Sequence, residues 1–203
     1  RKFPEVAGWL YTEHHDVINE WNGYWKFDRS EKETGLNEIL EGMTLNDFHA
    51  PVYLSTGVEV SRTVKGAEKI DVPLFISSMT STDYGEEIIV EYELSHTNYI
   101  AEEKLIKSDN FKIKYNPWMQ KSIKPLELIM PNSSGLSKLI FRVKTLDNKI
   151  LHRNFMHFEV NSNNKLKDVE VISLPAKEIS NSNWTKKKWE ILNGKKIHGA
   201  GSG

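Results

Sequence analysis

The amino-acid sequence predicts an all-β protein whose centre is an immunoglobulin-like β-sandwich. Three observations predict it. Apolar and polar residues alternate with a period of two in one segment after another between residues 51 and 161. Turn-forming residues separate these short segments. No helical pattern of ten or more residues interrupts them. Two sheets with such patterns bury their apolar faces against each other, so a sandwich is expected, with a closed barrel as the less favoured alternative.

Residues 1–50 are expected to form a separate region. Gly8–Thr12 is a short apolar run that predicts one buried strand, Asn22-Gly23 predicts a turn, and residues 34–41 are at best weakly helical. A lone strand cannot bury both faces, so this region needs a partner surface. We expect it to drape over the sandwich or to remain partly disordered. Its aromatic and histidine residues are concentrated at Trp9, His14, His15, Trp21 and Trp25.

Residues 51–161 predict a series of strands, of which 87–94 alternates most clearly. Pro73 predicts an edge strand or a bulge in the first strand, because proline cannot donate a ladder hydrogen bond. Residues 147–149 predict a turn before the last strand. The residues expected to share the buried faces are Val72, Leu74 and Ile76; Ile88, Val90, Tyr92 and Leu94; Phe111, Ile113 and Tyr115; Leu126, Leu128 and Met130; Leu139, Phe141, Val143 and Thr145; and Met156, Phe158 and Val160.

Residues 162–203 are expected to form a linker and tail. The polar stretch at 161–164 predicts a linker, and 169–175 predicts one further strand. Trp184 and Trp189 flank three lysines and are expected to pack against another domain. The Gly-rich run 199–203 lacks the lysine and the strand-to-helix setting of a phosphate-binding loop.

Composition narrows the function classes. Twenty-seven basic and 28 acidic residues give a net charge of -1, which argues against nucleic acid or an anionic membrane as the main partner. No apolar run approaches the roughly 20 residues of a membrane helix. The chain has no cysteine, which excludes disulfides and thiolate metal sites and leaves the compartment open, a secreted or periplasmic location included. No cofactor is expected.

The densest group of potential ligands lies at Glu13, His14, His15, Asp16 and Glu20. Adjacent residues on a strand point to opposite faces, so the two histidines are poorly placed to share a metal ion, and no metal site is predicted. The acids could suggest the paired carboxylates of glycoside hydrolysis, but that chemistry needs two carboxyl groups about 5 to 9 Å apart across a cleft. A solvated loop is the simpler expectation.

Two groups of motifs stand out near the ends of the sequence. The first group is Pro4–Glu13, Asp16-Val17, Glu20-Trp21-Asn22-Gly23 and Phe27-Asp28-Arg29, and the second is Trp184-Thr185, Trp189, Leu192–Lys196 and Gly199–Gly203. Both groups resemble family-two glycoside hydrolases, which include β-galactosidases, β-glucuronidases and β-mannosidases. The first group resembles the end of their catalytic barrel, and the second resembles a run that leads into a further β-domain. The chain departs from the family at His14-His15, where Leu-Thr is expected.

The resemblance implies a retaining glycosidase whose two catalytic glutamates lie on barrel strands before Arg1. Gly8–Thr12 would then be the eighth barrel strand, and the residues after it would lie at the end of the barrel where active sites gather. The chain itself is expected to be non-catalytic, with residues 1–50 as a barrel remnant, 51–161 as the sandwich, and 162–203 as the tail. Its partners would be the neighbouring barrel and, through the whole enzyme, a carbohydrate. The candidate sugar-contacting residues are Tyr11, Glu13, His14, Trp21 and Asn22.

Two other functions fit the same sequence. One is a free-standing carbohydrate-binding module with Trp21, Trp25 or Trp118 as stacking platforms, since flat aromatic rings pack against sugars. The other is a plain adhesion or assembly domain.

Overall fold

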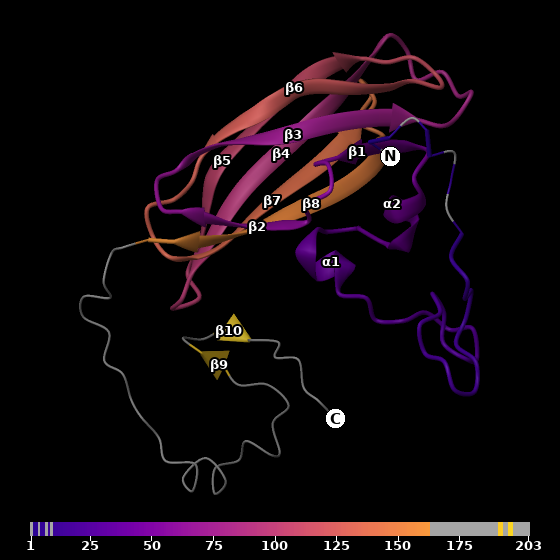
Figure 1. Ribbon diagram of the computed structural model, residues 1–203, viewed down its shortest axis with the longest axis horizontal. Coiled ribbons are helices and arrows are strands. Elements are labelled where there is room, and N and C mark those ends of the chain that lie inside the picture. The colour runs from indigo at the N-terminus through magenta and orange to yellow at the C-terminus, as the bar shows by residue number, and fades with distance from the viewer. Residues whose placement is uncertain are drawn as a thin grey trace, which may run out of the picture.

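The computed structural model describes residues 2–3, 5–6, 8, 10–162, 191–192 and 195–196. Within this part of the chain the fold is mostly β, as the alternation predicts, with two helices of one turn each (Figure 1). Neither helix has the length or apolarity that crossing a membrane requires. The helices are α1 (Leu36–Ile39) and α2 (Leu45–His49), and the strands are β1 (Val52–Ser55), β2 (Ser61–Lys65), β3 (Lys69–Ser78), β4 (Glu87–Asn98), β5 (Glu103–Lys114), β6 (Gln120–Ile129), β7 (Gly135–Lys144), β8 (Ile150–Asn161), β9 (Ile191–Leu192) and β10 (Lys195–Lys196).

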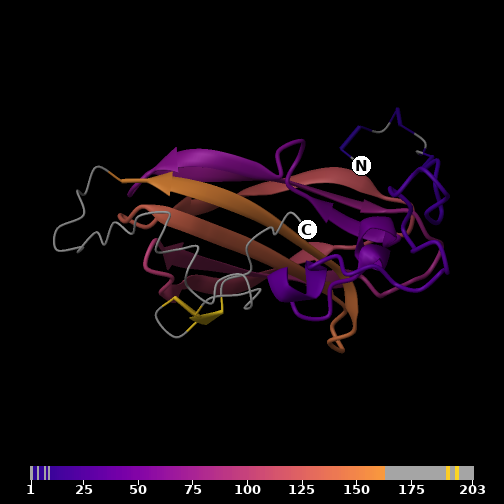
Figure 2. The same cartoon turned by 90° about the horizontal axis from the view of Figure 1, so that it is seen from below.

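Eight of these strands form two sheets. The smaller sheet is antiparallel with the order β1-β3-β6, and the larger has the order β2-β8-β7-β4-β5. The larger sheet is mixed, because β2 runs parallel to β8, whereas the other three pairs of neighbouring strands, β8–β7, β7–β4 and β4–β5, are antiparallel. β9 and β10 form a separate antiparallel pair. Figure 2 shows the two sheets as layers, one above the other.

The core lies between the two sheets, where the inward-facing residues of both meet. In β4 the burial alternates residue by residue, and Ile88, Val90 and Leu94 are fully buried. In β7 Leu139, Phe141 and Val143 lie on the same inner face, while Leu74 and Ile76 of β3 belong to the same core from the other sheet. Every residue predicted to face inward is buried, apart from the partly buried Phe111. Apolar burial of this extent is the main stabilising contribution to such a fold.

Pro73 lies at a β-bulge between β3 and β6, which confirms one of the two predicted settings. The register shifts between Val72 and Leu74. The other predicted setting, an edge strand, is wrong, because β3 is the central strand of its sheet. The proline is tolerated there because the pairing of β1 with β3 stops at Phe75. No residue of β1 therefore needs a backbone hydrogen bond from position 73, where proline has no N–H to donate.

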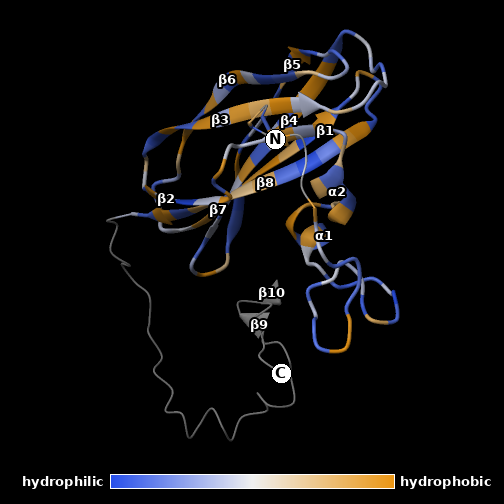
Figure 3. Cartoon of the chain, turned by 45° about the vertical axis from the view of Figure 1, so that its right-hand side comes forward, coloured by the Kyte–Doolittle hydropathy of each residue, from blue (hydrophilic) through white to orange (hydrophobic). Residues whose placement is uncertain are grey.

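The outer face of the larger sheet is partly covered by the N-terminal region. Ile140 of β7 packs with Leu36, Leu40 and Met43 in a second apolar cluster. In Figure 3 the apolar segments of α1 and α2 lie beside β8. Residues 36–45, just before the sandwich, therefore pack against it.

Helix α2 is anchored to β8 by Asp47. Thr44 and Asp47 form a capping box at the start of the helix. The Oδ1 of Asp47 also accepts a hydrogen bond from the Arg153 backbone N–H at 2.9 Å, and the Arg153 guanidinium lies 3.7 Å from it. This contact fixes the connection between the N-terminal region and the sandwich.

The predicted strand at Gly8–Thr12 is wrong. Gly8, Leu10, Tyr11 and Thr12 are exposed and belong to no strand, and Leu10 is 86% exposed. An isolated strand has neither backbone partners nor a surface against which to bury its side chains, so the apolar run does not pair within this chain. The predicted strand at 169–175, together with Trp184 and Trp189, lies outside the described residues.

Candidate functional site

The five candidate residues lie in a loop cluster formed by residues 11–33, which is organised around Asp16. The Oδ1 of this buried side chain accepts hydrogen bonds from the Gly23 backbone N–H at 3.0 Å and from the Lys32 ammonium at 2.5 Å. Lys32 also donates to the Trp21 carbonyl at 2.9 Å. The Asp16 backbone N–H donates to the Trp25 carbonyl at 2.9 Å. One carboxylate therefore holds three stretches of loop together.

Gly23 permits the closest approach in this cluster. A Cβ atom built on it would lie 2.2 Å from the backbone carbon of His15 and 2.4 Å from the backbone nitrogen of Asp16. Real Cβ atoms do not come so near to a backbone, so only glycine fits unless the two loop stretches move apart. The predicted turn at Asn22-Gly23 is a bend, and the chain returns from it to pair with His14 and His15.

Tyr11 and Asn22 are brought together at the edge of the cluster. The Tyr11 hydroxyl donates to the Asn22 carbonyl, and the ring stacks on Tyr24 with centroids 4.2 Å apart and planes 7° apart. Tyr24 in turn contacts His49 of α2, with its hydroxyl 3.1 Å from the histidine Nε2. Burial, and then the neighbouring Tyr11, raise the pKa of Tyr24. This chain of three rings connects the loop cluster to the helix that is anchored on β8.

Glu13 is a buried carboxyl group with an unusual environment. Its side chain is 7% exposed, and neither carboxyl oxygen accepts a hydrogen bond from the described residues. Burial, and then the nearby Glu20 carboxyl, raise the pKa of Glu13. Burial and the neighbouring carboxyl group thus both disfavour the ionised form of Glu13.

His14 and Trp21 present their side chains to solvent, and Trp21 is 80% exposed. The His14 carbonyl accepts hydrogen bonds from the backbone N–H groups of Tyr24 and Trp25. Its ring lies edge-on to His15, with centroids 6.0 Å apart. No three His, Asp or Glu side chains among the described residues lie close enough together to hold a metal ion.

A hollow of about 700 Å³ lies beside the loop cluster, and its lining contains none of the five candidate residues. Tyr24 and Trp25 lie on one side, and the segment from Glu31 to Glu38 and the start of α2 complete it. Sequence reasoning identified Trp25 as a possible stacking platform. It missed the polar residues of the hollow, which have no shared spacing that could reveal them: Thr34, Asn37, Thr44 and Asn46.

Comparison with known proteins gives no family. No family model matches the chain, and no curated protein matches it. Among solved structures, a CARDB domain from Pyrococcus furiosus in complex with di-metal ions is 11% identical with a TM-score of 0.39, over 55% of this chain and 92% of that one. A β-glucosidase from Listeria innocua in complex with gluconolactone is 15% identical with a TM-score of 0.39, over 79% of this chain. The sporulation control protein Spo0M from Bacillus subtilis is 11% identical with a TM-score of 0.37, over 56% of this chain. The chain spans 20% of the β-glucosidase and 50% of Spo0M.

Proposed function

We propose that this chain is the barrel end and the immunoglobulin-like sandwich of a family-two glycoside hydrolase, and that it supports and shapes a sugar site without performing the hydrolysis. The proposal starts from the motifs Asp16-Val17 and Asn22-Gly23, which resemble the segment after the last barrel strand in that family. The sandwich would act as a rigid mount for that segment. The whole enzyme would cleave O-glycosidic bonds with retention, using glutamates supplied by the barrel.

One observation carries the proposal: the motif residues are the ones that hold the loop cluster together. The Asp16 carboxylate accepts the Gly23 N–H, and Gly23 has no space for a side chain. The spacing of the motif thus has a physical reason, since the aspartate must reach the glycine seven residues later. A motif with a structural role of this kind is more specific than residue identity alone.

The acids of the cluster suit a supporting role better than a catalytic one. Asp16 is neutralised by Lys32 and is engaged in positioning the loop. The Glu20 carboxyl is near enough to raise the pKa of Glu13, so the two groups lie side by side and not across a sugar ring from each other, as hydrolysis requires. In the proposed whole enzyme, Tyr11, Glu13, His14, Trp21 and Asn22 would line the rim of the sugar cleft.

Hydrolysis of chromogenic aryl glycosides tests the proposal. The 203-residue chain is expected to give no turnover, while a longer chain that includes the preceding coding sequence is expected to hydrolyse at least one aryl glycoside with retention. In that longer chain, Asp16→Asn should lower activity, whereas the exposed Lys69→Met on β3 should not. Turnover by the 203-residue chain, or a preceding sequence without a barrel that carries two glutamates, would overturn the proposal.

A carbohydrate-binding module is the second candidate, and exposed tryptophans favour it. Trp21 is 80% exposed and Trp118, in the turn between β5 and β6, is 68% exposed. Exposed flat rings of this size can stack on the apolar face of a sugar ring. Titration of the chain with oligosaccharides, followed by tryptophan fluorescence, tests this function. A response that disappears in Trp21→Ala or Trp118→Ala supports it, and an unchanged spectrum removes it.

A further inference from the structure

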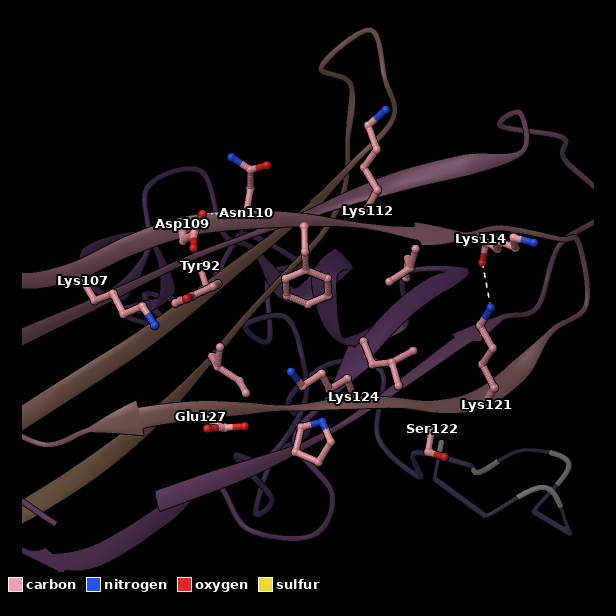
Figure 4. A pocket seen from close by; sticks show the side chains of 15 residues that line it. Tyr92, Lys107, Asp109, Asn110, Lys112, Lys114, Lys121, Ser122, Lys124 and Glu127 are labelled. Atoms are coloured by element: carbon pink, nitrogen blue, oxygen red, sulfur yellow. Dashed lines mark hydrogen bonds between the residues drawn. The ribbon is translucent and has the colours of Figure 1, made fainter. Parts of the chain in front are cut away.

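A groove of about 680 Å³ runs between β5 and β6, the outermost strands on one side of the two sheets (Figure 4). Apolar side chains from both strands form its floor, with Tyr92 of β4 at the base. Tyr92 is buried, so the groove opens directly onto the core. The apolar floor residues are Phe111, Ile113, Ile123, Pro125 and Leu126.

The lining of this groove is strongly basic in a chain that is nearly neutral overall. Five lysines and two acidic residues line it. Among the described residues, Lys112 alone of the five pairs directly with a carboxylate, that of Glu87 at 3.2 Å. The lysines are Lys107, Lys112, Lys114, Lys121 and Lys124, and the acids are Asp109 and Glu127.

Two of the ammonium groups reach over the apolar floor from opposite walls. Lys107 of β5 lies over the Tyr92 ring, 5.6 Å from its centroid, and Lys124 of β6 extends toward the groove from the other side, whereas Lys112 points away (Figure 4). Lys121 spans the groove and donates to the Lys114 carbonyl at 2.9 Å. The groove therefore combines an apolar floor with a positive rim, which fits a ligand that is both apolar and anionic.

Both walls are edge strands with one unpaired side. Within the described part of the chain, β5 pairs with β4 alone and β6 with β3 alone. Residues Glu103 to Asn110 of β5 are exposed on both faces, and Leu105 is 56% exposed. Lysines on an edge strand commonly discourage pairing with other chains. Lys107 and Lys124 also extend over an apolar floor, where they can meet acidic groups of a bound chain.

We propose that this groove binds an extended acidic segment of a partner protein by strand addition to β5. Backbone groups of the segment pair with the free edge. Alternate side chains of a strand share one face, so the inward-facing positions of the segment carry apolar side chains, which enter the floor, and acidic ones, which meet Lys107 and Lys124. A strand of eight residues spans about 26 Å, enough to cover the β5 residues that line the groove. An anionic polysaccharide fits less well, because the floor is largely aliphatic and the strand edges match a peptide backbone. The inference stands independently of the proposed glycosidase function.

Fluorescence anisotropy with the full 203-residue chain tests the proposal. The probe is a labelled eight-residue peptide that carries two valines and two glutamates at the alternate positions of one face, with threonine at the positions between them. Binding is expected for this peptide and is expected to weaken at high salt. It should be absent for a valine–lysine peptide of the same length. It should also be lost when prolines replace the glutamates' neighbours, because proline cannot donate to a strand edge.

Variants place the binding in the groove. The double change Lys107→Glu and Lys124→Glu is expected to weaken peptide binding about tenfold or more. Lys65→Glu, on β2 at the opposite edge of the same sheet, is the matched control and should bind as the unchanged chain does. Both lysines of the double variant are exposed, so the fold is expected to survive, which thermal unfolding checks.

Four outcomes would overturn the proposal. The first is no binding of the valine–glutamate peptide by a folded chain. The second is equal binding of the proline-substituted peptide, which would exclude strand addition. The third is unchanged affinity in the double variant. The fourth is stronger binding of polygalacturonate, or of vesicles containing phosphatidylserine, with loss in the same double variant.

Discussion

The carboxylate of Asp16 and the ammonium group of Lys32 form a 2.5 Å ion pair in which the aspartate side chain is 6% exposed and the lysine side chain 24% exposed. The pair closes the loop cluster that follows the proposed barrel end. Since the same Asp16 oxygen also accepts the Gly23 N–H, the ion pair and the glycine bend form one unit.

Removal of the lysine should loosen the loop cluster. Lys32→Met leaves a buried aspartate without its ammonium partner, and because the lysine is partly exposed the expected cost is about 1–2 kcal/mol of local stability. Amide hydrogen exchange at Gly23 and Trp25 measures it. The control is Lys69→Met, which removes an exposed ion pair with Glu127 and should leave stability nearly unchanged. Equal effects of the two substitutions would contradict the assigned role of Lys32.

The space at Gly23 predicts a sharp difference between two glycine substitutions. Gly23→Ala places a methyl group on the backbone of His15 and Asp16, so the cluster must open and its amides should exchange faster. Gly8→Ala is the matched control, because no atom lies within 4 Å of a Cβ built there. The expected loss at Gly23 is about 2 kcal/mol or more, in the range of other overpacking changes. A Gly23→Ala chain with unchanged hydrogen exchange would show that the loop stretches are not held as described.

Core packing predicts a large global effect for one phenylalanine. Phe141 on β7 is 1% exposed and lies between the two sheets, so Phe141→Ala should cost about 3–5 kcal/mol of unfolding free energy. Leu136→Ala on the same strand removes a side chain that is 50% exposed and should cost about 0.5 kcal/mol or less. Urea unfolding followed by circular dichroism compares them. A small effect at Phe141 would mean that the sheets do not share one core.

The strands were predictable from sequence because their information is local. In β4 a period of two, kept from Glu87 to Leu94, is enough to state which side chains enter the core. The setting of Pro73 was also partly predictable, because proline has no backbone N–H and is therefore restricted to a few positions in a sheet. The choice between edge and bulge was not local, because it depends on how far β1 extends along β3.

The candidate site was much less predictable, because its contacts join distant positions without a repeating pattern. Lys32 lies 16 residues from Asp16, and no periodicity links them. The burial of Ile140 under Leu36 and Met43 similarly depends on a chain reversal that the alternation of β7 does not record. The prediction at Leu10 was wrong for a different reason. The apolar run indicated a buried strand, but burial requires a partner surface, and Leu10 is exposed.

The buried carboxyl group of Glu13 predicts that removal of its charge stabilises the chain. Burial, and then Glu20, raise the pKa of Glu13 above its ordinary 4.5. Between 4.5 and the raised pKa the native state binds more protons than the unfolded state, so unfolding free energy falls as pH rises through that window. Glu13→Gln should therefore stabilise the chain at pH 7 and have little effect at pH 4. Thermal unfolding at pH 7 and pH 4 measures this effect. Glu20→Gln removes only the charge of the neighbouring group, so it should stabilise the chain at pH 7 by a smaller amount. A Glu13→Gln chain that is destabilised only at pH 7 would contradict the prediction.

Acidification should destabilise the sandwich through a buried histidine. His96 of β4 lies between two hydroxyl groups, with Nδ1 2.9 Å from Ser137 and Nε2 3.0 Å from Ser133, and burial lowers its pKa below 6.5. Between the lowered pKa and 6.5 the unfolded state binds more protons than the native state, so unfolding free energy decreases as pH falls through this window. Burial, and then Lys138, also lower the pKa of His157, which adds a contribution of the same sign.

Separate variants distinguish the two histidines. His96→Gln keeps groups that can hydrogen-bond the serines but cannot take up a proton, so the loss of stability between pH 7.5 and pH 5.5 in urea unfolding should be smaller in this variant than in the unchanged chain. His157→Gln should remove the contribution of His157 to this loss of stability. The unfolding free energy of the double variant should depend least on pH. Because the two side chains lie on different strands, their contributions should add approximately. A His96→Gln chain with an undiminished loss on acidification would show that the Ser133–His96–Ser137 contact does not report on proton uptake, and that other groups govern acid stability.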